Sequence, residues 1–146
     1  MVTLRVEVKA KGPLFRRGVP KRVMDKHVKA TIQDLVELGE HELHRILRPR
    51  PAGVFLSVAE AQRGKASVGT YRLGVMGRVQ PGGGGVIEQT GTGAVYGPWL
   101  EGVSPRNFTT RFRGYNSFRR TSQWLERQAK KVLQSHVVRM ARELRR

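Results

Sequence analysis

Imidazole and carboxylate side chains, which are common metal ligands in proteins, lie close together in His41-Glu42-Leu43-His44. In the zinc-protease motif two histidines are four residues apart and the glutamate follows the first, whereas these two histidines are three residues apart. Glu37, His41 and His44 could share one face of a helix, but such residues more often form a solvated helix surface. The spacing therefore predicts no metal site.

Other kinds of catalytic chemistry also lack their usual residues. The glycine runs in residues 82–85 and 91–93 are not followed by the Gly-Lys-Ser or Gly-Lys-Thr of a phosphate-binding loop. Asp and Glu together number only 11, and most of them stand beside bases in helical patterns, which leaves little material for a metal-dependent nuclease. We expect a protein that is not an enzyme and that carries no cofactor.

A third group of residues fits binding better than catalysis. Residues 102–117 interleave arginine with aromatic side chains, namely Arg106, Phe108, Arg111, Phe112, Arg113 and Tyr115. These residue types are enriched in buried contacts between proteins, and a loop of this length usually contacts something. We expect this loop, together with Tyr96, Trp99 and Glu101 just before it, to form an interface.

Some of these residues have a second interpretation. Trp99 and Trp124 also occur at the spacing of ordinary core residues. Glu101 would hold the loop in one geometry if it paired with an arginine of the loop or of a neighbouring subunit, and otherwise it would be an exposed carboxylate. The sequence leaves both alternatives open.

The same stretch resembles the neck or tail-completion proteins of tailed bacteriophages. The resemblance rests on Tyr96-Gly97-Pro98-Trp99-Leu100-Glu101-Gly102, Arg106-Asn107, Thr110-Arg111-Phe112, Gly114-Tyr115 and Phe118-Arg119. It is dense over residues 93–125, looser over residues 19–48, and weak between residues 49 and 91. It implies a structural virion protein that joins head to tail as a homo-oligomeric ring of six or twelve copies.

The resemblance also implies where such a ring would lie. Its neighbours would be the head-tail adaptor, tail terminator or tail tube proteins, and its place would be the neck or tail of the virion after synthesis in the host cytoplasm. A closed ring needs two different faces on each subunit, and the apolar segment before the loop plus the loop itself could supply them.

The net charge of +17, from 28 Lys and Arg residues, predicts attraction to polyanions. A basic nucleic-acid-binding module, with contact to packaged DNA through the final helix, is therefore the main alternative function. The charge could equally match acidic neighbours in an assembly or be solvated. Size alone would also fit an antitoxin-like or host-interaction protein.

The composition limits the architecture. The 146 residues suit one domain, residues 1–146, with one modest core. The absence of cysteine excludes disulfides and thiolate zinc sites. No apolar run approaches the ~20 residues of a membrane span, so we expect a soluble, cytosolic chain without membrane contact.

Hydrophobic periodicity predicts most of the elements. Residues 2–9 alternate as a half-buried strand, and residues 20–48 carry an apolar helical stripe. The stripe includes Gly39, where we expect another backbone to pack closely, with a slight helix kink as the alternative. Residues 71–79 predict a strand with glycine bulges or close approaches, and residues 86–90 its partner in a flexible, Gly-rich hairpin over about residues 70–91. Residues 52–61 fit either a strand or a short helix.

The C-terminal part completes the fold. Residues 94–103 have the pattern of a strand that Pro98 confines to a sheet edge or bends. Asn116 or Ser117 can cap a long final helix with one apolar face and one face rich in Arg and Lys. The sequence predicts an α+β fold, in which two long helices pack on a small, mostly antiparallel sheet with a long Gly-rich hairpin.

Overall fold

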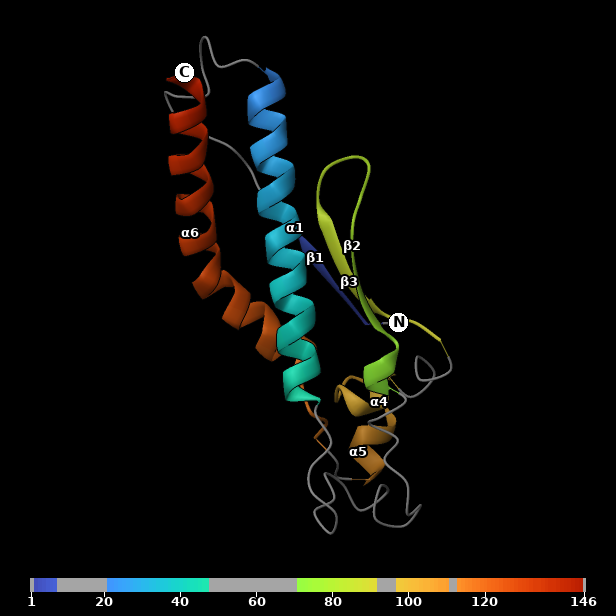
Figure 1. The fold of residues 1–146 in the computed structure, drawn as a ribbon. Coiled ribbons are helices and arrows are strands. Elements are labelled where there is room, and N and C mark those ends of the chain that lie inside the picture. Colours follow the sequence, from blue (N-terminus) through green and yellow to red (C-terminus); the bar gives the residue numbers. More distant parts are fainter. Residues whose placement is uncertain (1, 8–20, 48–70, 92–96, 111–112, 146) are drawn as a thin grey trace.

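A computed structural model describes residues 2–7, 21–47, 71–91, 97–110 and 113–145 (Figure 1). The elements are β1 (Thr3–Val6), α1 (Lys21–Ile46), β2 (Val75–Val79), β3 (Gly85–Gln89), α4 (Gly97–Leu100), α5 (Arg106–Thr110) and α6 (Ser117–Leu144). Two long helices, α1 and α6, run side by side, and α1 lies against a three-stranded antiparallel sheet. The predicted α+β architecture is confirmed. The ambiguous residues 52–61, and residues 94–96 of the predicted edge strand, lie outside the described residues.

The sheet has the order β1-β3-β2, with β3 in the centre and buried along its whole length. Leu4 and Val6 of β1 point into the core, as the alternation predicted. β2 and β3 form the predicted antiparallel hairpin, whose turn is closed by the Gln80 N–H donating to the Gly84 carbonyl at 2.9 Å. The pairing in β2 is continuous, so Gly77 marks no bulge; it gives room to Val36 of α1, whose Cγ1 a Cβ would overlap.

Two of the predicted strands include residues that are helical in the structure. Residues 71–73 form a helical turn before β2, and Tyr71 is fully buried there. Residues 97–100 form the helical turn α4 and not the edge strand predicted around Pro98. A proline without an N–H is compatible with the first turn of a helix as well as with a sheet edge, and here the Glu101 N–H donates to the Gly97 carbonyl at 2.8 Å.

Gly39 lies where α1 meets both β3 and α6. A Cβ at this position would overlap the terminal methyl groups of Ile87 and Leu125. The predicted close approach at Gly39 is therefore real, although side chains make it and not the backbone that was expected. The apolar stripes of α1 and α6 meet the sheet in one core, which includes Leu35, Leu43, Ile87, Leu100, Phe118 and Leu125.

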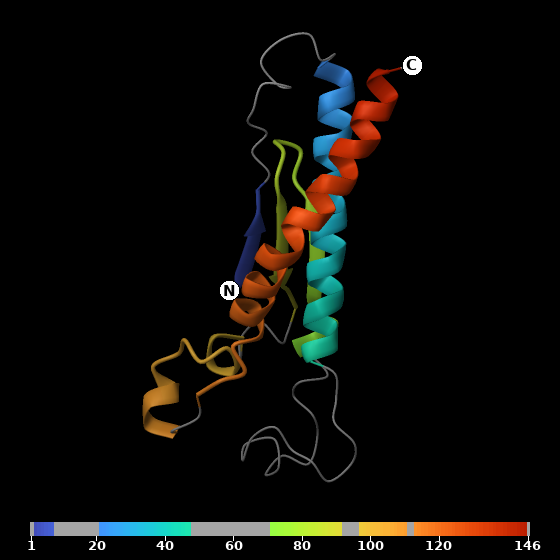
Figure 2. The same cartoon turned by 90° about the vertical axis from the view of Figure 1, so that its left-hand side faces the viewer.

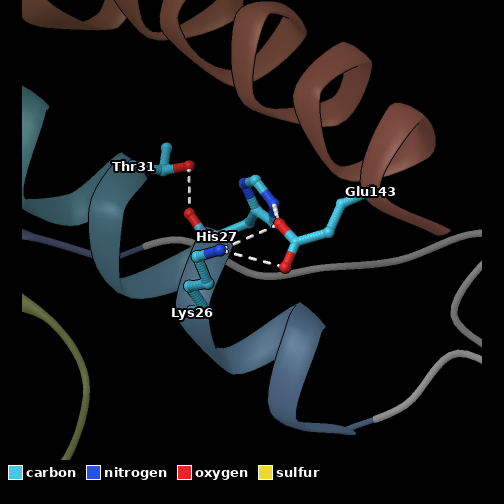
Figure 3. A network of polar contacts seen from close by, with 4 residues as sticks. All are labelled: Lys26, His27, Thr31 and Glu143. Atoms are coloured by element: carbon cyan, nitrogen blue, oxygen red, sulfur yellow. Dashed lines mark hydrogen bonds and ion pairs between the residues drawn. The ribbon is translucent and has the colours of Figure 1, made fainter. Parts of the chain in front are cut away.

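Polar contacts join the N-terminal part of α1 to the C-terminal part of α6. Figure 3 shows Lys26 and His27 of α1 reaching Glu143 of α6, with Nζ to Oε1 at 2.9 Å and Nε2 to Oε2 at 3.0 Å. Hydrogen bonding by Lys26 and then by His27 lowers the pKa of Glu143. A second pair, His136 to Asp34, has Nε2 2.8 Å from Oδ2. These contacts fix the pairing of the helices beyond the sheet.

Among the helices that the structure describes, none combines the length and apolar character needed to cross a bilayer. Both long helices keep many charged residues on their outer sides. Most of their apolar residues face the core, and Leu133 and Val138 of α6 are exposed.

Leu125→Ala should destabilise the protein by about 2–5 kcal/mol, because truncating a buried leucine leaves a cavity between α6, α1 and the sheet. Leu133→Ala is the matched control: the same change on the same helix at a side chain that is 43% exposed. Chemical denaturation measures both. Equal destabilisation of the two variants would mean that the core is not where the structure places it.

Candidate functional site

A loop projects from the end of the molecule where α1 ends and α6 begins. It comprises residues 102–114, includes α5, and joins α4 to α6; it is called the projecting loop below. In Figure 2, α5 stands clear of the two long helices and of the sheet. Of the arginine and aromatic residues predicted to form an interface, those that the structure describes lie in this loop or directly beside it.

Two glycines allow the two ends of the projecting loop to come into contact at its base. Gly102 has φ 82° and Gly114 has φ 75°, a conformation that favours glycine. A Cβ on Gly102 would overlap the Arg113 carbonyl, and one on Gly114 would overlap the Gly102 backbone. Beside them the Tyr115 N–H donates to the Leu100 carbonyl at 2.6 Å. The two ends of the loop therefore touch backbone to backbone.

The side chain of Glu101 connects the base of the loop to the start of α6 by hydrogen bonds. Its side chain accepts hydrogen bonds from the Ser117 hydroxyl, from the Phe118 N–H at 3.0 Å and from the Tyr71 hydroxyl at 3.4 Å. Asn116 occupies the N-cap position, as predicted, but its side chain makes no capping bond and its backbone is left-handed, with φ 51°. The carboxylate of Glu101 thus caps the first turn of α6 from outside the helix.

The burial of Glu101 corrects both sequence interpretations of this residue. Glu101 is only 3% exposed, so it is not an exposed carboxylate and offers no surface to a partner. Its hydrogen-bond partners among the described residues are the hydroxyls of Tyr71 and Ser117 and backbone N–H groups at the start of α6, and not the arginine that one of the two alternatives named. Burial raises the pKa of Glu101, and the hydrogen bonds from Ser117, Phe118 and Tyr71 oppose that rise. Burial likewise raises the pKa of Tyr71, with the charge of Glu101 adding to it.

Asn107 braces the interior of the projecting loop. Its Nδ2 donates to the Trp99 carbonyl at 2.9 Å, and its Oδ1 accepts from the Ser104 N–H at 2.9 Å. Its own N–H donates to the Ser104 carbonyl at 2.9 Å. These bonds tie α5 back to α4, so the loop has an internal framework of its own.

The outer surface of the projecting loop is apolar at two positions. Phe108 is 89% exposed and Val103 is 70% exposed. Arg106 and Arg113 are exposed as well. A large aromatic ring on a braced loop, with arginines nearby, has the composition of a protein-binding site.

The remaining predicted interface residues divide into two groups. Trp99 and Tyr115 are half-buried and pack against the core, so they connect the loop to the core. Tyr96, Arg111 and Phe112 lie outside the described residues. Gly102, Gly114 and Asn107 were missed as site residues; the glycines at the two ends of the arginine and aromatic stretch were the available signal.

Metal chemistry has no support in the described part of the chain, where no three His, Asp or Glu side chains gather closely enough to hold an ion. His41 is exposed, and His44 has Nε2 3.9 Å from Oε1 of Glu40. Glu37, on the same helix face, is also exposed.

No protein-family model, curated protein or solved structure matches the chain. The geometry of the projecting loop, its residue types and the charge distribution are therefore the features from which a function is inferred.

Gly102→Ala should cost about 2–4 kcal/mol of stability, since it adds a left-handed alanine and a collision with the Arg113 backbone. Gly91→Ala is the matched control, because Gly91 has a similar φ of 79° but nothing within 4 Å of a new Cβ. It should cost only about 1 kcal/mol. Thermal and chemical denaturation of the two variants measures the difference. Equal losses of stability would contradict the close backbone contact at the base of the loop.

Glu101→Ala should destabilise the protein by about 2–4 kcal/mol, because the Phe118 N–H and the Ser117 hydroxyl lose a buried partner. Glu101→Gln keeps an acceptor and a donor in the same place and should cost less than about half as much. Denaturation of both variants gives the comparison. A Glu101→Ala variant with the same stability as the wild type would contradict the capping role.

The raised pKa of Glu101 is tested by comparing the wild type with Glu101→Gln over a range of pH. The folded state holds the proton more tightly than the unfolded chain, so the stability linked to this group is fully present below about pH 4.5 and is lost as the pH rises through the folded pKa. The stability of the wild type minus that of Glu101→Gln should therefore fall as the pH rises from about 4. A difference that grows with pH would mean that the pKa is lowered.

Proposed function

We propose that the chain is a structural component of a tailed-phage virion, a neck or tail-completion subunit that assembles into a ring through its projecting loop. The proposal places the ring between the portal-adaptor complex and the tail tube, in six or twelve copies. Two lines support it. Residues 96–119 carry the motifs that resemble this family. The described residues of this stretch, 97–110 and 113–119, form the projecting loop and the segments that support it.

The exposed ring of Phe108 carries the proposal most directly. An aromatic side chain that is 89% exposed contributes nothing to the core of its own subunit. Burying such a ring against a partner supplies the central apolar contact of a binding hot spot. The bonds of Asn107 and the glycine contact at the base hold the loop in shape before binding, which reduces the entropy cost of association.

Ring closure needs a second and different face on the same subunit. Leu73, in the turn before β2, and Met76, on β2, are exposed apolar side chains outside the projecting loop. A neighbouring subunit that places Phe108 on this surface would join two unlike faces, which is the arrangement that a rotational ring requires. The adaptor, tail terminator or tail tube proteins would meet the completed ring.

Phe108→Ala should leave the monomer as stable as the wild type and weaken subunit association by about 2 kcal/mol or more, roughly 30-fold. Val138→Ala, which removes another exposed apolar side chain from the distant end of α6, is the control and should assemble normally. Melting curves and sedimentation equilibrium give the two readouts. Normal assembly of Phe108→Ala, alone and with tail tube or adaptor protein, would remove the loop from the interface.

A further inference from the structure

The outer side of α6 carries a basic surface that the ring proposal does not use. Its members are Arg119, Arg120, Arg127, Lys130 and Lys131, all of them exposed; together they are called the basic face. At 100° per residue they fall within about 120° of the helix circumference, on the side away from Phe118 and Leu125. One side of α6 therefore enters the core and the opposite side is cationic.

One carboxylate borders the basic face, and the five cations outnumber it. The acidic residues of α6 are Glu126 and Glu143. Glu143 pairs with Lys26 and His27 at the far end of the helix. Glu126 stands one turn before Lys130, at the edge of the basic face, and also lines a hollow with Arg5 and Leu4.

The basic face continues onto α1 through a hollow of about 260 Å³. Arg45 of α1 and Arg120 and Arg127 of α6 line it, with Gln123 and the partly buried Trp124. Glu42 also faces this hollow, but its oxygens accept bonds from Arg45 at 2.6 and 2.7 Å. Hydrogen bonding by Arg45 lowers the pKa of Glu42, and the charge of Arg120 lowers it further. One ionised carboxylate against three guanidinium groups leaves the hollow positive.

We propose that the basic face of α6 binds the phosphate backbone of double-stranded DNA without reading its sequence. From Arg119 to Lys131 the helix rises about 18 Å, and one strand of a duplex presents about five phosphates along that length. Arginine and lysine along one helix side follow such a row of charges and release its counterions. Contacts between such cations and phosphate oxygens are the same on every sequence, so binding of this kind does not depend on the bases.

A protein partner fits the same surface less well. Lysine is depleted in protein interfaces, and their centres contain aromatic and apolar anchors. The basic face has two lysines, and its nearest aromatic residue, Trp124, packs against the core. The projecting loop has the composition of a protein interface, and the basic face has that of a polyanion-binding surface.

The test uses the full-length chain and a blunt duplex of arbitrary sequence, with binding followed by fluorescence anisotropy over a series of salt concentrations. The test variant carries Arg120→Gln, Arg127→Gln and Lys131→Gln. The control variant carries Arg5→Gln, Arg22→Gln and Lys29→Gln, which remove the same charge from exposed positions on β1 and α1. Melting curves establish that both variants are folded, and sedimentation records their assembly.

The affinity of the test variant for the duplex should fall by on the order of tenfold or more. The slope of log affinity against log salt should become shallower by about 2.7, which is about 0.9 for each of the three phosphates that the variant no longer neutralises. The control variant should keep the wild-type slope, and a second duplex of unrelated sequence should bind equally well. Equal weakening in the two variants would overturn the proposal, because net charge and not the basic face would then explain binding.

Two further outcomes separate this proposal from the ring. A test variant that binds the duplex normally but no longer assembles would assign the basic face to an acidic protein neighbour and would overturn DNA binding. A wild-type protein that remains monomeric would count against the ring. The comparison of the two triple variants in the duplex titration would still test DNA binding. The two proposals therefore fail in different measurements.

Discussion

The buried carboxylate of Glu101 is the group on which the arrangement of the site depends. It joins three segments: the end of α4, the first turn of α6 through Ser117 and Phe118, and the turn before β2 through Tyr71. Removing a carboxylate from water is costly unless donors surround it, and here three do. The projecting loop leaves the fold at this point and returns to it at Gly114. The direction of the loop is thus set by the core and not by the loop alone.

Beyond this anchor the molecule carries two surfaces of different composition, to which the two proposals assign different partners. The projecting loop presents an aromatic ring on a braced backbone, while the outer side of α6 presents cations over about a third of its circumference. The two surfaces are close in sequence near the start of α6, because the projecting loop ends at Gly114 and the basic face begins at Arg119. A subunit built in this way can hold neighbouring subunits with one surface and leave the other for a polyanion.

The sequence predicted the parts of this fold that depend on local periodicity. The apolar stripes indicated α1 and α6, the alternation indicated β1, and the turn residues indicated the β2–β3 hairpin. Prediction failed where the structure depends on contacts between residues far apart in the sequence. Glu101 meets Ser117 and Tyr71, which are 16 and 30 residues away, and no local pattern marks that meeting. Pro98 suits a sheet edge and a first helical turn equally, so tertiary packing selected α4. The exposure of Phe108 also depended on the loop geometry, whereas the cationic side of α6 followed from helical spacing alone.

Assembly of identical subunits through the projecting loop is the central claim, and the mass of the purified wild-type chain tests it most directly. Native mass spectrometry, alone and after mixing with adaptor or tail tube protein, should give one closed species of six or twelve copies. A heterologous interface that closes yields a single stoichiometry. A chain that stays monomeric in every mixture, or that forms an open-ended ladder of sizes, would contradict the account.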